Sequence, residues 1–323
     1  MILDILLLVV GLALVVLGAD WLVDGASAIA RRSGISEFVI GLTIVGFGTS
    51  CPELVVSLTG AIEGLSDVAL GNVIGSNVFN VLLILGLTAL ISPTAITRDN
   101  ARRDMPIVLA VTLILLLFGL KHTIFHISAD GLSRIDGGIF ILIFAGYIYY
   151  CFKTDKGSDV EADPDSVSDS KQTKLPAAIG LVIAGLAGLI IGGRLFVDNA
   201  VDVGEASGIS EKIIAITILA GGTSVPELAT CLVAIAKKKD QLALGNILGS
   251  NVFNILLILG SSALVRPVSF ASINVIDAAA LVASGLLPMI WALTGCKDRI
   301  DRFEGAMMLA CYGAYMYLLF LNL

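Results

Sequence analysis

The sequence predicts an all-α polytopic membrane protein, and three observations support this fold class. Hydrophobic residues make up 57% of the 323 positions, charged residues make up only 15%, and the mean hydropathy is +0.95. The apolar residues also gather in long stretches that are separated by short polar loops. Because soluble domains carry roughly a quarter charged residues, this chain has too few of them to cover itself with a solvated surface. We therefore expect it to lie in a lipid bilayer, with no nucleic acid partner.

Ten stretches of the chain are long and apolar enough to cross the membrane. A helix needs about 20 apolar residues to span the hydrocarbon core of a bilayer. The stretches lie at residues 3–30, 36–62, 68–91, 104–120, 134–152, 176–203, 210–236, 241–264, 273–294 and 303–322. Each is predicted to form one transmembrane helix.

One polar segment, residues 153–175, separates the first five spans from the last five. It carries an excess of acidic residues among Ser, Pro and Gly residues. This composition is typical of a disordered linker.

The spacing of acidic residues in the linker also resembles the start of a calcium-binding EF-hand loop, with Asp159, Glu161 and Asp163 at alternate positions. However, Pro164 stands where the turn glycine of that loop belongs, and Ser170 stands where its closing glutamate belongs. We therefore favour a plain solvated linker over a calcium-binding loop.

The Lys and Arg residues of the loops predict the orientation of the chain. Fifteen of the 20 lie on one side of the membrane, together with the linker, four lie on the other side, and Arg194 falls within a span. Cytoplasmic loops are enriched in such residues. We therefore expect a protein of the cytoplasmic (inner) cell membrane, with a cytoplasmic linker and with both termini outside.

Two motifs occur twice, at a constant separation of 174 residues. The segment GNVIGSNVFN at 71–80 returns as GNILGSNVFN at 245–254, and GTSCPE at 48–53 returns as GTSVPE at 222–227. Five predicted spans separate equivalent points, and five is an odd number. The two copies must therefore cross the membrane in opposite directions, as in the inverted repeats of secondary transporters.

The duplication sets the predicted domain organisation. Residues 1–152 form the first five-helix repeat, residues 153–175 form the acidic cytoplasmic linker, and residues 176–323 form the second, inverted repeat. Substrate sites in such proteins lie near the bilayer midplane, where the repeats meet.

Glu53 and Glu227 lie at equivalent positions inside the second and seventh spans. An ionisable side chain at this depth costs at least a few kcal/mol, so it is a functional candidate. Each follows a proline, Pro52 or Pro226, which has no N–H and clashes with the carbonyl four residues earlier. Both helices are therefore predicted to be broken here, with carbonyl oxygens released from the helical pattern.

Hydroxyl groups accompany each glutamate on the same helix face. Residues three or four positions apart are neighbours on a helix. Thr49 and Ser50 stand in this relation to Glu53, and Thr223 and Ser224 stand in it to Glu227. Such a set of oxygen atoms is what hard cations such as Na⁺ and Ca²⁺ require. The five cysteines show no CxxC or zinc spacing, so we predict neither a transition metal nor a cofactor.

A polar stripe with a period of four residues runs along the third and eighth spans: Asn72, Ser76 and Asn80, then Asn246, Ser250 and Asn254. Glycines beside each stripe predict close helix contact; they are Gly71, Gly75, Gly245 and Gly249. Asparagine also bridges membrane helices for structural reasons alone. For Asn72, Asn77, Asn246 and Asn251, a structural role and a ligand role stay equal alternatives.

The paired motifs GTSxPE and GNxxGSNxFN resemble the alpha-repeats of the sodium/calcium exchanger branch of the calcium/cation antiporter superfamily. The resemblance covers nearly the whole chain. It implies ten transmembrane helices in two inverted five-helix repeats, with helices 2 and 7 broken at the ion site. It also implies a secondary-active antiporter, and not an enzyme, which exchanges Ca²⁺ for Na⁺ across the membrane by alternating access.

The resemblance further implies the roles of individual residues in a group of central cation sites. Calcium and sodium would share the two carboxylates, and two threonines would add oxygens for calcium; these residues are Glu53, Glu227, Thr49 and Thr223. The cytoplasm-side sodium site would use Ser50, Ser76 and the carbonyl of Gly46. The external sodium site would use Ser224, Ser250 and the carbonyl of Ala220. Asn80 and Asn254 would close the centre.

One departure concerns Asn254, where potassium-dependent members of the superfamily carry aspartate. Without that carboxylate, two central carboxylates remain, and two negative charges balance one Ca²⁺ or two Na⁺. Exchange of Ca²⁺ for H⁺ is the main alternative, because the glutamates could carry protons. An intramembrane hydrolase is a remote alternative: it would need a Ser–His, Ser–Lys or paired-Asp arrangement, whereas both histidines lie outside the core and no lysine is intramembrane.

Asp20 and Arg194 occupy equivalent repeat positions inside the first and sixth spans. We expect them to form a gating pair, directly or through Asp24 and Asp198. The alternative is that these side chains extend to the membrane interface.

Overall fold

The computed structural model describes residues 2–126, 130–155, 173–207, 220–294 and 298–321. Its contacts divide the chain into two units, which are described separately. Unit 1 comprises Met1–Thr49 and Ile148–Gly249, and unit 2 comprises Ser50–Tyr147 and Ser250–Leu323. Each unit therefore combines segments from both halves of the sequence, so the contact-based units are not the two sequence repeats.

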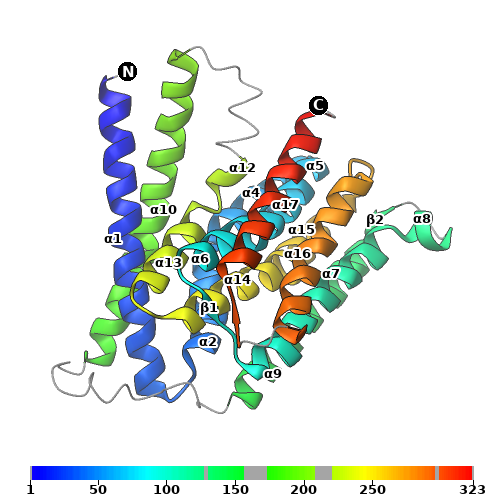
Figure 1. Cartoon of the computed structure of the whole chain (residues 1–323). Coiled ribbons are helices and arrows are strands. Elements are labelled where there is room, and N and C mark those ends of the chain that lie inside the picture. Colours follow the sequence, from blue (N-terminus) through cyan, green and yellow to red (C-terminus); the bar gives the residue numbers. More distant parts are fainter. Residues whose placement is uncertain (1, 127–129, 156–172, 208–219, 295–297, 322–323) are drawn as a thin grey trace. The chain divides into compact units, whose positions relative to one another are not determined.

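Helices form the main part of unit 1 (Figure 1). They are α1 (Ile2–Ser33), α2 (Glu37–Ile40), the π-helix η1 (Gly41–Val45), α3 (Gly46–Thr49), α10 (Leu175–Ala206), α12 (Ala220–Gly222) and α13 (Val225–Ala236). Two further helices contribute to both units: α9 (Arg134–Thr154) and α14 (Asp240–Val252).

Unit 2 contains further helices and four short strands. The helices are α4 (Cys51–Glu63), α5 (Ser66–Val78), η2 (Phe79–Leu85), α6 (Gly86–Ile91), η3 (Asn100–Asp104), α7 (Met105–Gly119), α8 (Lys121–Phe125), η6 (Phe253–Leu259), α15 (Gly260–Val265), α16 (Val275–Thr294) and α17 (Arg302–Leu321). The strands are β1 (Thr94–Ala95), β2 (Gly131–Leu132), β3 (Val268–Ser269) and β4 (Arg299–Ile300).

The strands correct the all-α prediction in a small way. β1 pairs with β4, and β2 pairs with β3, in each case antiparallel. Each strand has only two residues and lies between helices, so no alternating apolar pattern is long enough to indicate it in the sequence. The two pairs tie loops of the first half of the chain to loops of the second half.

Seven helices of the described residues are long and apolar enough to cross a membrane, and eight are if the bent pair Glu37–Thr49 and Cys51–Glu63 counts as one span. These eight match eight of the ten predicted spans. In the stretch 104–120 the structure has α7, of 15 residues. In the stretch 210–236, residues 210–219 lie outside the described part, and α13 follows as a shorter apolar helix.

α1 and α10 run side by side and antiparallel in unit 1 (Figure 1). Glycines allow their backbones to meet: a methyl group on Gly18 would lie 2.8 Å from the carbonyl oxygen of Gly185. One on Gly11 would lie 2.9 Å from the carbonyl oxygen of Gly192, and one on Gly25 would lie 2.8 Å from that of Ala178. The contacts recur every seven residues, as expected for two helices that pack along one seam.

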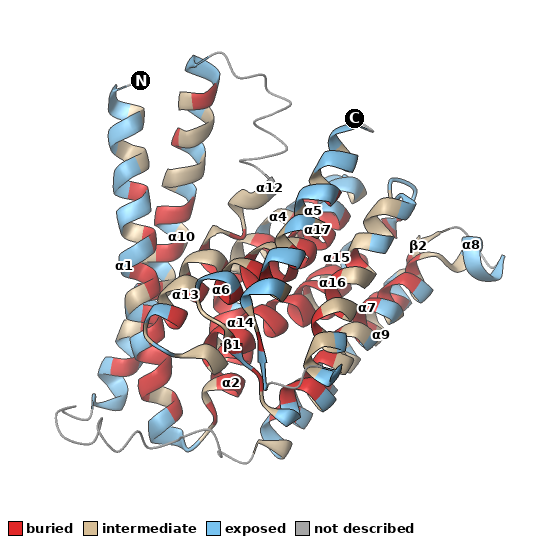
Figure 2. Ribbon diagram, in the orientation of Figure 1, coloured by how far each residue is buried: buried red, intermediate tan, exposed pale blue. Residues whose placement is uncertain are grey.

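A second close contact joins α14 to α2 and η1, and it confirms part of the predicted glycine edge. A methyl group on Gly245 would clash with the carbonyl oxygen of Phe38, and one on Gly249 would clash with that of Leu42. Figure 2 shows α14 as buried over most of its length. At Gly71 and Gly75 a methyl group would meet nothing within 4 Å among the described residues, so the close helix contact predicted at these two glycines is absent there.

Both predicted helix breaks are present. Ser50 separates α3 from α4, and Thr223 and Ser224 separate α12 from α13. The backbone angles are φ −81° and ψ 6° at Ser50, and φ −91° and ψ 9° at Ser224. Pro52 and Pro226 then stand in the first turn of the following helix. Proline is tolerated there because the first amides of a helix have no helical acceptor.

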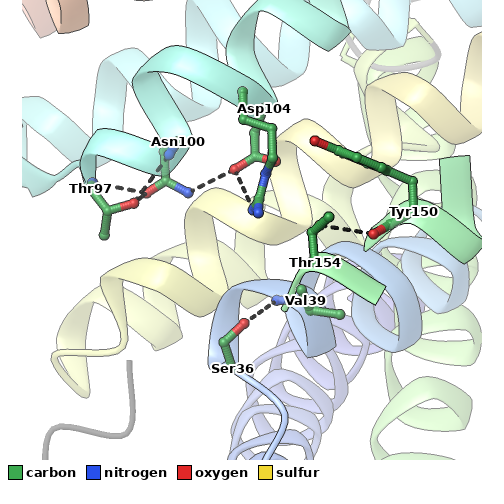
Figure 3. Close-up of polar contacts among 8 residues, drawn as sticks. Ser36, Val39, Thr97, Asn100, Asp104, Tyr150 and Thr154 are labelled. Carbon is green, nitrogen blue, oxygen red and sulfur yellow. Dashed lines mark hydrogen bonds and ion pairs between the residues drawn. The ribbon is translucent and has the colours of Figure 1, made fainter. Parts of the chain in front are cut away.

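Local polar contacts fix other helix starts (Figure 3). In unit 1 the Ser36 hydroxyl accepts a hydrogen bond from the amide of Val39 at 3.2 Å and caps α2. In unit 2 the Asn100 side chain accepts from the Thr97 hydroxyl at 2.8 Å and donates to Asp104 at 3.3 Å. These contacts hold the π-helix η3 ahead of α7.

The predicted repeat recurs in the secondary structure with the same separation as in the sequence. The elements α5, η2 and α6 return as α14, η6 and α15, and the strand β1 returns as β3. The π-helices correspond residue by residue, since Phe79–Leu85 and Phe253–Leu259 are 174 positions apart. Single π-segments inside helices are frequent at functional sites.

Candidate cation-binding site

The two intramembrane glutamates lie at the starts of α4 and α13. Glu53 is in the first turn of α4 in unit 2, Glu227 is in the first turn of α13 in unit 1, and both are 0% exposed. The amides of a first turn carry the positive end of the helix dipole. This end of a helix attracts negative groups, so the break places each glutamate where the helix dipole favours a carboxylate.

In unit 2, polar groups of α5 surround Glu53. The Ser76 hydroxyl donates a hydrogen bond of 3.5 Å to Oε1 of Glu53. The Asn72 amide donates to the main-chain oxygen of Glu53 at 3.2 Å and to the Ser57 hydroxyl at 2.9 Å. The Ser57 hydroxyl donates in turn to the carbonyl of Ala69 at 3.4 Å. The predicted polar stripe therefore faces the predicted carboxylate in this unit.

In unit 1, a corresponding chain of contacts starts at Thr49. Its hydroxyl lies 3.1 Å from Oδ1 of Asn246, to which it donates, and 3.4 Å from the carbonyl oxygen of Gly46. The Asn246 amide donates to Sγ of Cys231 at 3.4 Å, and that thiol lies 3.7 Å from the carbonyl oxygen of Ala243. Asn246, Cys231 and Ala243 are the repeat counterparts of Asn72, Ser57 and Ala69.

Four asparagines of unit 2 form a reciprocal set of hydrogen bonds. The amide of Asn77 in α5 donates to the main-chain oxygen of Asn251 in α14 at 3.2 Å, and the amide of Asn251 donates to that of Asn77 at 3.3 Å. The amide of Asn80 in η2 donates to Oδ1 of Asn251 at 3.2 Å. The amide of Asn254 in η6 donates to Oδ1 of Asn77 at 2.9 Å.

The amide oxygens of Asn80 and Asn254 are buried, and neither accepts a hydrogen bond from any residue that the structure describes. A neutral carbonyl oxygen without a donor is a ready ligand for a hard cation. Both residues occupy the second position of a π-helix. They were predicted to close the centre of the site, and the contacts place them together within unit 2.

The other predicted site residues are mainly buried. Ser50, Ser224 and Ser250 are buried, as is Gly46, while Thr223 is half-buried. Ala220 begins α12, and only its backbone is described. Among the described residues, no group of three or more His, Cys, Asp or Glu side chains could hold a metal ion. A cation held among these residues would therefore need neutral oxygens as ligands in addition to carboxylates.

Asn77 and Asn251 gain a structural explanation that the sequence left open, because both orient other asparagines. Ser57 and Cys231 were missed by sequence reasoning. Their signal was available: each lies four residues after a site glutamate, on the same helix face, and the two are 174 positions apart.

The predicted direct pair of Asp20 and Arg194 is wrong. α1 and α10 are antiparallel with Gly18 opposite Gly185, so Asp20 and Arg194 lie about 16 Å apart along the helix axes. Asp20 instead pairs with Lys237, whose ammonium lies 2.7 Å from its carboxylate and 2.7 Å from that of Asp24. Arg194 is exposed and makes no ion pair within the described part of the chain.

Lys237 follows α13 and joins it to α1. Burial lowers the pKa of Lys237, but the hydrogen bonds and negative charges of Asp20 and Asp24 outweigh burial, so the pKa lies above its ordinary value. The ammonium is therefore charged throughout the physiological pH range. A second ion pair, between Lys239 and Glu37 at 2.8 Å, joins the same loop to α2.

The chain resembles known membrane proteins over most of its length. The model of the family described as "Sodium/calcium exchanger protein" matches residues 3–153 and 177–321. The chain is 32% identical to "Sodium/calcium exchanger MaX1" of Methanosarcina acetivorans over 98% of each chain. It is 38% identical to "Inner membrane protein YrbG" of Escherichia coli, over 83% of this chain and 81% of that protein.

The fold is also similar to that of a relative whose structure has been solved. The structure of "the sodium-calcium exchanger NCX_Mj" soaked without Na⁺ and Ca²⁺ is 31% identical in sequence and has a TM-score of 0.84. The alignment covers 98% of this chain and 99% of that one.

Proposed function

Because the chain belongs to the sodium/calcium exchanger protein family, we propose that it exchanges Ca²⁺ for Na⁺ by alternating access. The family is one of exchangers and not of enzymes, which removes the intramembrane hydrolase from consideration. The protein is accordingly an integral membrane antiporter of this family. The identity of the counter-ion and the mode of transport are the proposed parts.

The observation that carries the proposal is the buried hydroxyl beside Glu53, together with the recurrence of the same residues around Glu227 in the second repeat. Glu53 is accompanied by the hydroxyl of Ser76, and the equivalent segment of the other repeat places Glu227 after the break at Ser224. A carrier of protons alone would need the carboxylates but not the hydroxyls and amide oxygens around them. Neutral oxygens are ligands of Na⁺ and Ca²⁺, so they favour sodium over a proton as the counter-ion.

We assign roles to these residues as the family resemblance implied. Glu53 and Glu227 bind both cations, and the calcium ligands are completed by Thr49 and Thr223. Sodium binds with oxygens of Ser50, Ser76 and Gly46 in one repeat, and with those of Ser224, Ser250 and Ala220 in the other. The two negative charges of the carboxylates balance either one Ca²⁺ or two Na⁺. Ca²⁺ and Na⁺ therefore compete for the same two side chains.

The proposed topology has ten transmembrane helices in two inverted repeats, residues 1–152 and 176–323. The antiparallel course of α1 and α10 supports the inversion, because these helices occupy equivalent places in the two repeats. The same course brings the end of α1, with Arg31 and Arg32, near the start of α10. Both ends flank the linker side that the positive charges predict to be cytoplasmic.

We therefore place the protein in the cytoplasmic membrane, with both termini outside and the acidic linker at 153–175 inside. The central part of this linker lies outside the described residues. Asp155, at its start, accepts a hydrogen bond of 2.9 Å from the amide of Ser36, ahead of α2.

Calcium flux into proteoliposomes tests the proposal. The purified protein is reconstituted, and radioactive Ca²⁺ uptake is followed under an imposed Na⁺ gradient or an imposed pH gradient of equal driving force. We expect the outward Na⁺ gradient to drive uptake. Uptake driven by the pH gradient alone would overturn the sodium assignment in favour of Ca²⁺/H⁺ exchange.

Variants of the glutamates test the site. Glu53→Gln and Glu227→Gln keep the size of the side chain but remove its charge, so we expect each to lower exchange at least a hundredfold. Glu63→Gln is a matched control, because Glu63 ends the same helix α4 and is exposed. Normal exchange by both site variants would show that the cations bind elsewhere.

A further inference from the structure

The partners of Asn77 and Asn251 determine which way each side-chain amide is turned. Each side-chain amide lies against the main-chain carbonyl of the other residue. A carbonyl oxygen can only accept a hydrogen bond, so Nδ2 of each amide must point to it. The Oδ1 atom of each side chain must then point the opposite way.

This orientation propagates to the two asparagines of the π-helices. The Oδ1 atoms of Asn251 and Asn77 face the side chains of Asn80 and Asn254, respectively. Reversing the amide of Asn80 or Asn254 would set two oxygen acceptors against each other. Both residues must therefore direct Nδ2 toward the inner pair, and their own Oδ1 atoms must point away from it.

The result is two amide oxygens that are held in a fixed direction. Both are buried, and neither receives a hydrogen bond from any residue in the described ranges. A buried oxygen without a donor is unfavourable unless another group satisfies it. A cation that has lost its water would do so, and would find the oxygens already aligned.

We propose that Asn77 and Asn251 are positioning residues, which present the amide oxygens of Asn80 and Asn254 to the transported cation. The proposal rests on the proposed function and adds two residues to it. The support crosses between the repeats: Asn77 of the first repeat orients Asn254 of the second, and Asn251 orients Asn80. Within the described structure, the side chain of Asn77 makes no hydrogen bond to that of Asn80, its neighbour in the same repeat, and the same holds for Asn251 and Asn254.

The crossed pattern distinguishes positioning from packing. Asn77→Ala removes the acceptor for Asn254 but keeps the main-chain carbonyl to which Asn251 donates. The orientation of Asn251, and through it that of Asn80, therefore survives in this variant. A side chain that only packed the two helices would show no such preference for one partner.

The test is a set of double-mutant cycles on Ca²⁺ binding to the purified full-length protein, measured by titration with radioactive Ca²⁺. We expect Asn77→Ala to raise the half-saturating Ca²⁺ concentration roughly tenfold, since it removes a hydrogen bond that orients a ligand. When Asn254 is already alanine, Asn77→Ala should change the half-saturating Ca²⁺ concentration less than about twofold. In an Asn80→Ala background it should again change it roughly tenfold.

A second double-mutant cycle starts from Asn251→Ala. This substitution should have little effect on Ca²⁺ affinity in an Asn80→Ala background and its full effect in an Asn254→Ala background. This second cycle carries the test if one single variant fails to fold. Thr88→Val is the folding control, because the buried Thr88 hydroxyl of α6 donates, within the described structure, only to the carbonyl of Leu85 at the end of the preceding η2, at 2.9 Å. We expect it to leave Ca²⁺ affinity unchanged.

Equal effects of Asn77→Ala on Ca²⁺ affinity in the Asn254→Ala and Asn80→Ala backgrounds would overturn the proposal. It would also be overturned if Asn77→Ala lowered the thermal stability of the protein but left its Ca²⁺ affinity unchanged. Such results would leave the exchanger function intact provided that Glu53→Gln still abolishes Ca²⁺ binding. Absence of Ca²⁺ binding by the unmodified protein would instead contradict the proposed function, and this inference with it.

Discussion

The ammonium of Lys237, directly after α13, lies 2.7 Å from the carboxylate of Asp24 in α1. The same ammonium also pairs with Asp20. α13 carries Glu227 in its first turn, so this ion pair connects a helix of the candidate site to one helix of the glycine-packed pair α1 and α10.

Lys237→Gln should lower the thermal stability of the protein by about 0.5–1 kcal/mol, and high salt should reduce the difference. The effect is modest because the carboxylates of Asp20 and Asp24 are about half exposed, and such pairs are screened by water and ions. The loss should be constant between pH 6 and 9. A group whose pKa is raised by folding contributes its stability below its unfolded pKa and loses it only as the pH rises through the folded value.

Thermal unfolding in detergent at low and high salt checks this prediction. Arg194→Gln is the control, because Arg194 is exposed and has no ion pair in the described part of the chain. A larger loss from Arg194→Gln than from Lys237→Gln would show that Arg194, and not Lys237, holds α1.

Gly185→Ala should destabilise the pair of α1 and α10. A methyl group there would lie 2.6 Å from the amide nitrogen of Leu22 and 2.7 Å from the carbonyl oxygen of Gly18, and backbone atoms cannot rotate aside. Overpacking of this kind costs about 1–3 kcal/mol. Gly180→Ala, in the same helix, is the matched control, because a methyl group there meets nothing among the described residues within 4 Å. Equal melting temperatures of the two variants would contradict the close contact.

Cys231→Ser should preserve calcium exchange. The thiol of Cys231 accepts from Asn246 in the way that the Ser57 hydroxyl accepts from Asn72 in the other repeat, so a hydroxyl can take its place. Cys231→Val has a similar volume but removes the acceptor, and a buried amide then loses a hydrogen bond at a cost of about 1–3 kcal/mol. Flux and thermal stability of both variants check the prediction. Equal behaviour of the serine and valine variants would show that the thiol serves only as an apolar group.

Asn254→Asp should make the stability of the ion-free protein depend on pH. Position 254 donates a hydrogen bond to Oδ1 of Asn77, and a carboxyl group can do so only while it keeps its proton. Stability should therefore be close to that of the original protein at low pH and fall by about 1–3 kcal/mol as the pH rises and the carboxyl group ionises. Melting temperatures from pH 5 to 9 provide the measurement. The Asn254→Ala variant is the control, and a parallel pH profile for the two variants would disprove the assigned direction of this hydrogen bond.

Much of the candidate site could be predicted from the sequence because the duplication marks it twice. Glu53 and Glu227, each preceded by proline, were identifiable from their charge within apolar stretches. The breaks at Ser50 and Ser224 followed from the missing amide of the prolines. These features depend on residues close together in the chain, so local rules of helix formation were sufficient to predict them.

Other predictions failed where they needed the register between distant helices. The pairing of Asp20 with Arg194 followed from their equivalent positions in the repeats. The glycine contacts between α1 and α10, however, set Asp20 far from Arg194, and a lysine of the loop after α13 reaches Asp20 instead. Sequence symmetry relates positions, but it does not say which of them touch.

The sequence by itself determined that this chain is a membrane protein with a duplicated motif, a buried carboxylate in each copy and a family to which those motifs belong. Composition, periodicity and proline chemistry act locally, and each can be read along the chain. Only the tertiary structure decided that Asn77 serves Asn254 and that Asn251 serves Asn80. The direction of an amide is set by the donors and acceptors around it, and here these come from a segment more than 170 residues away.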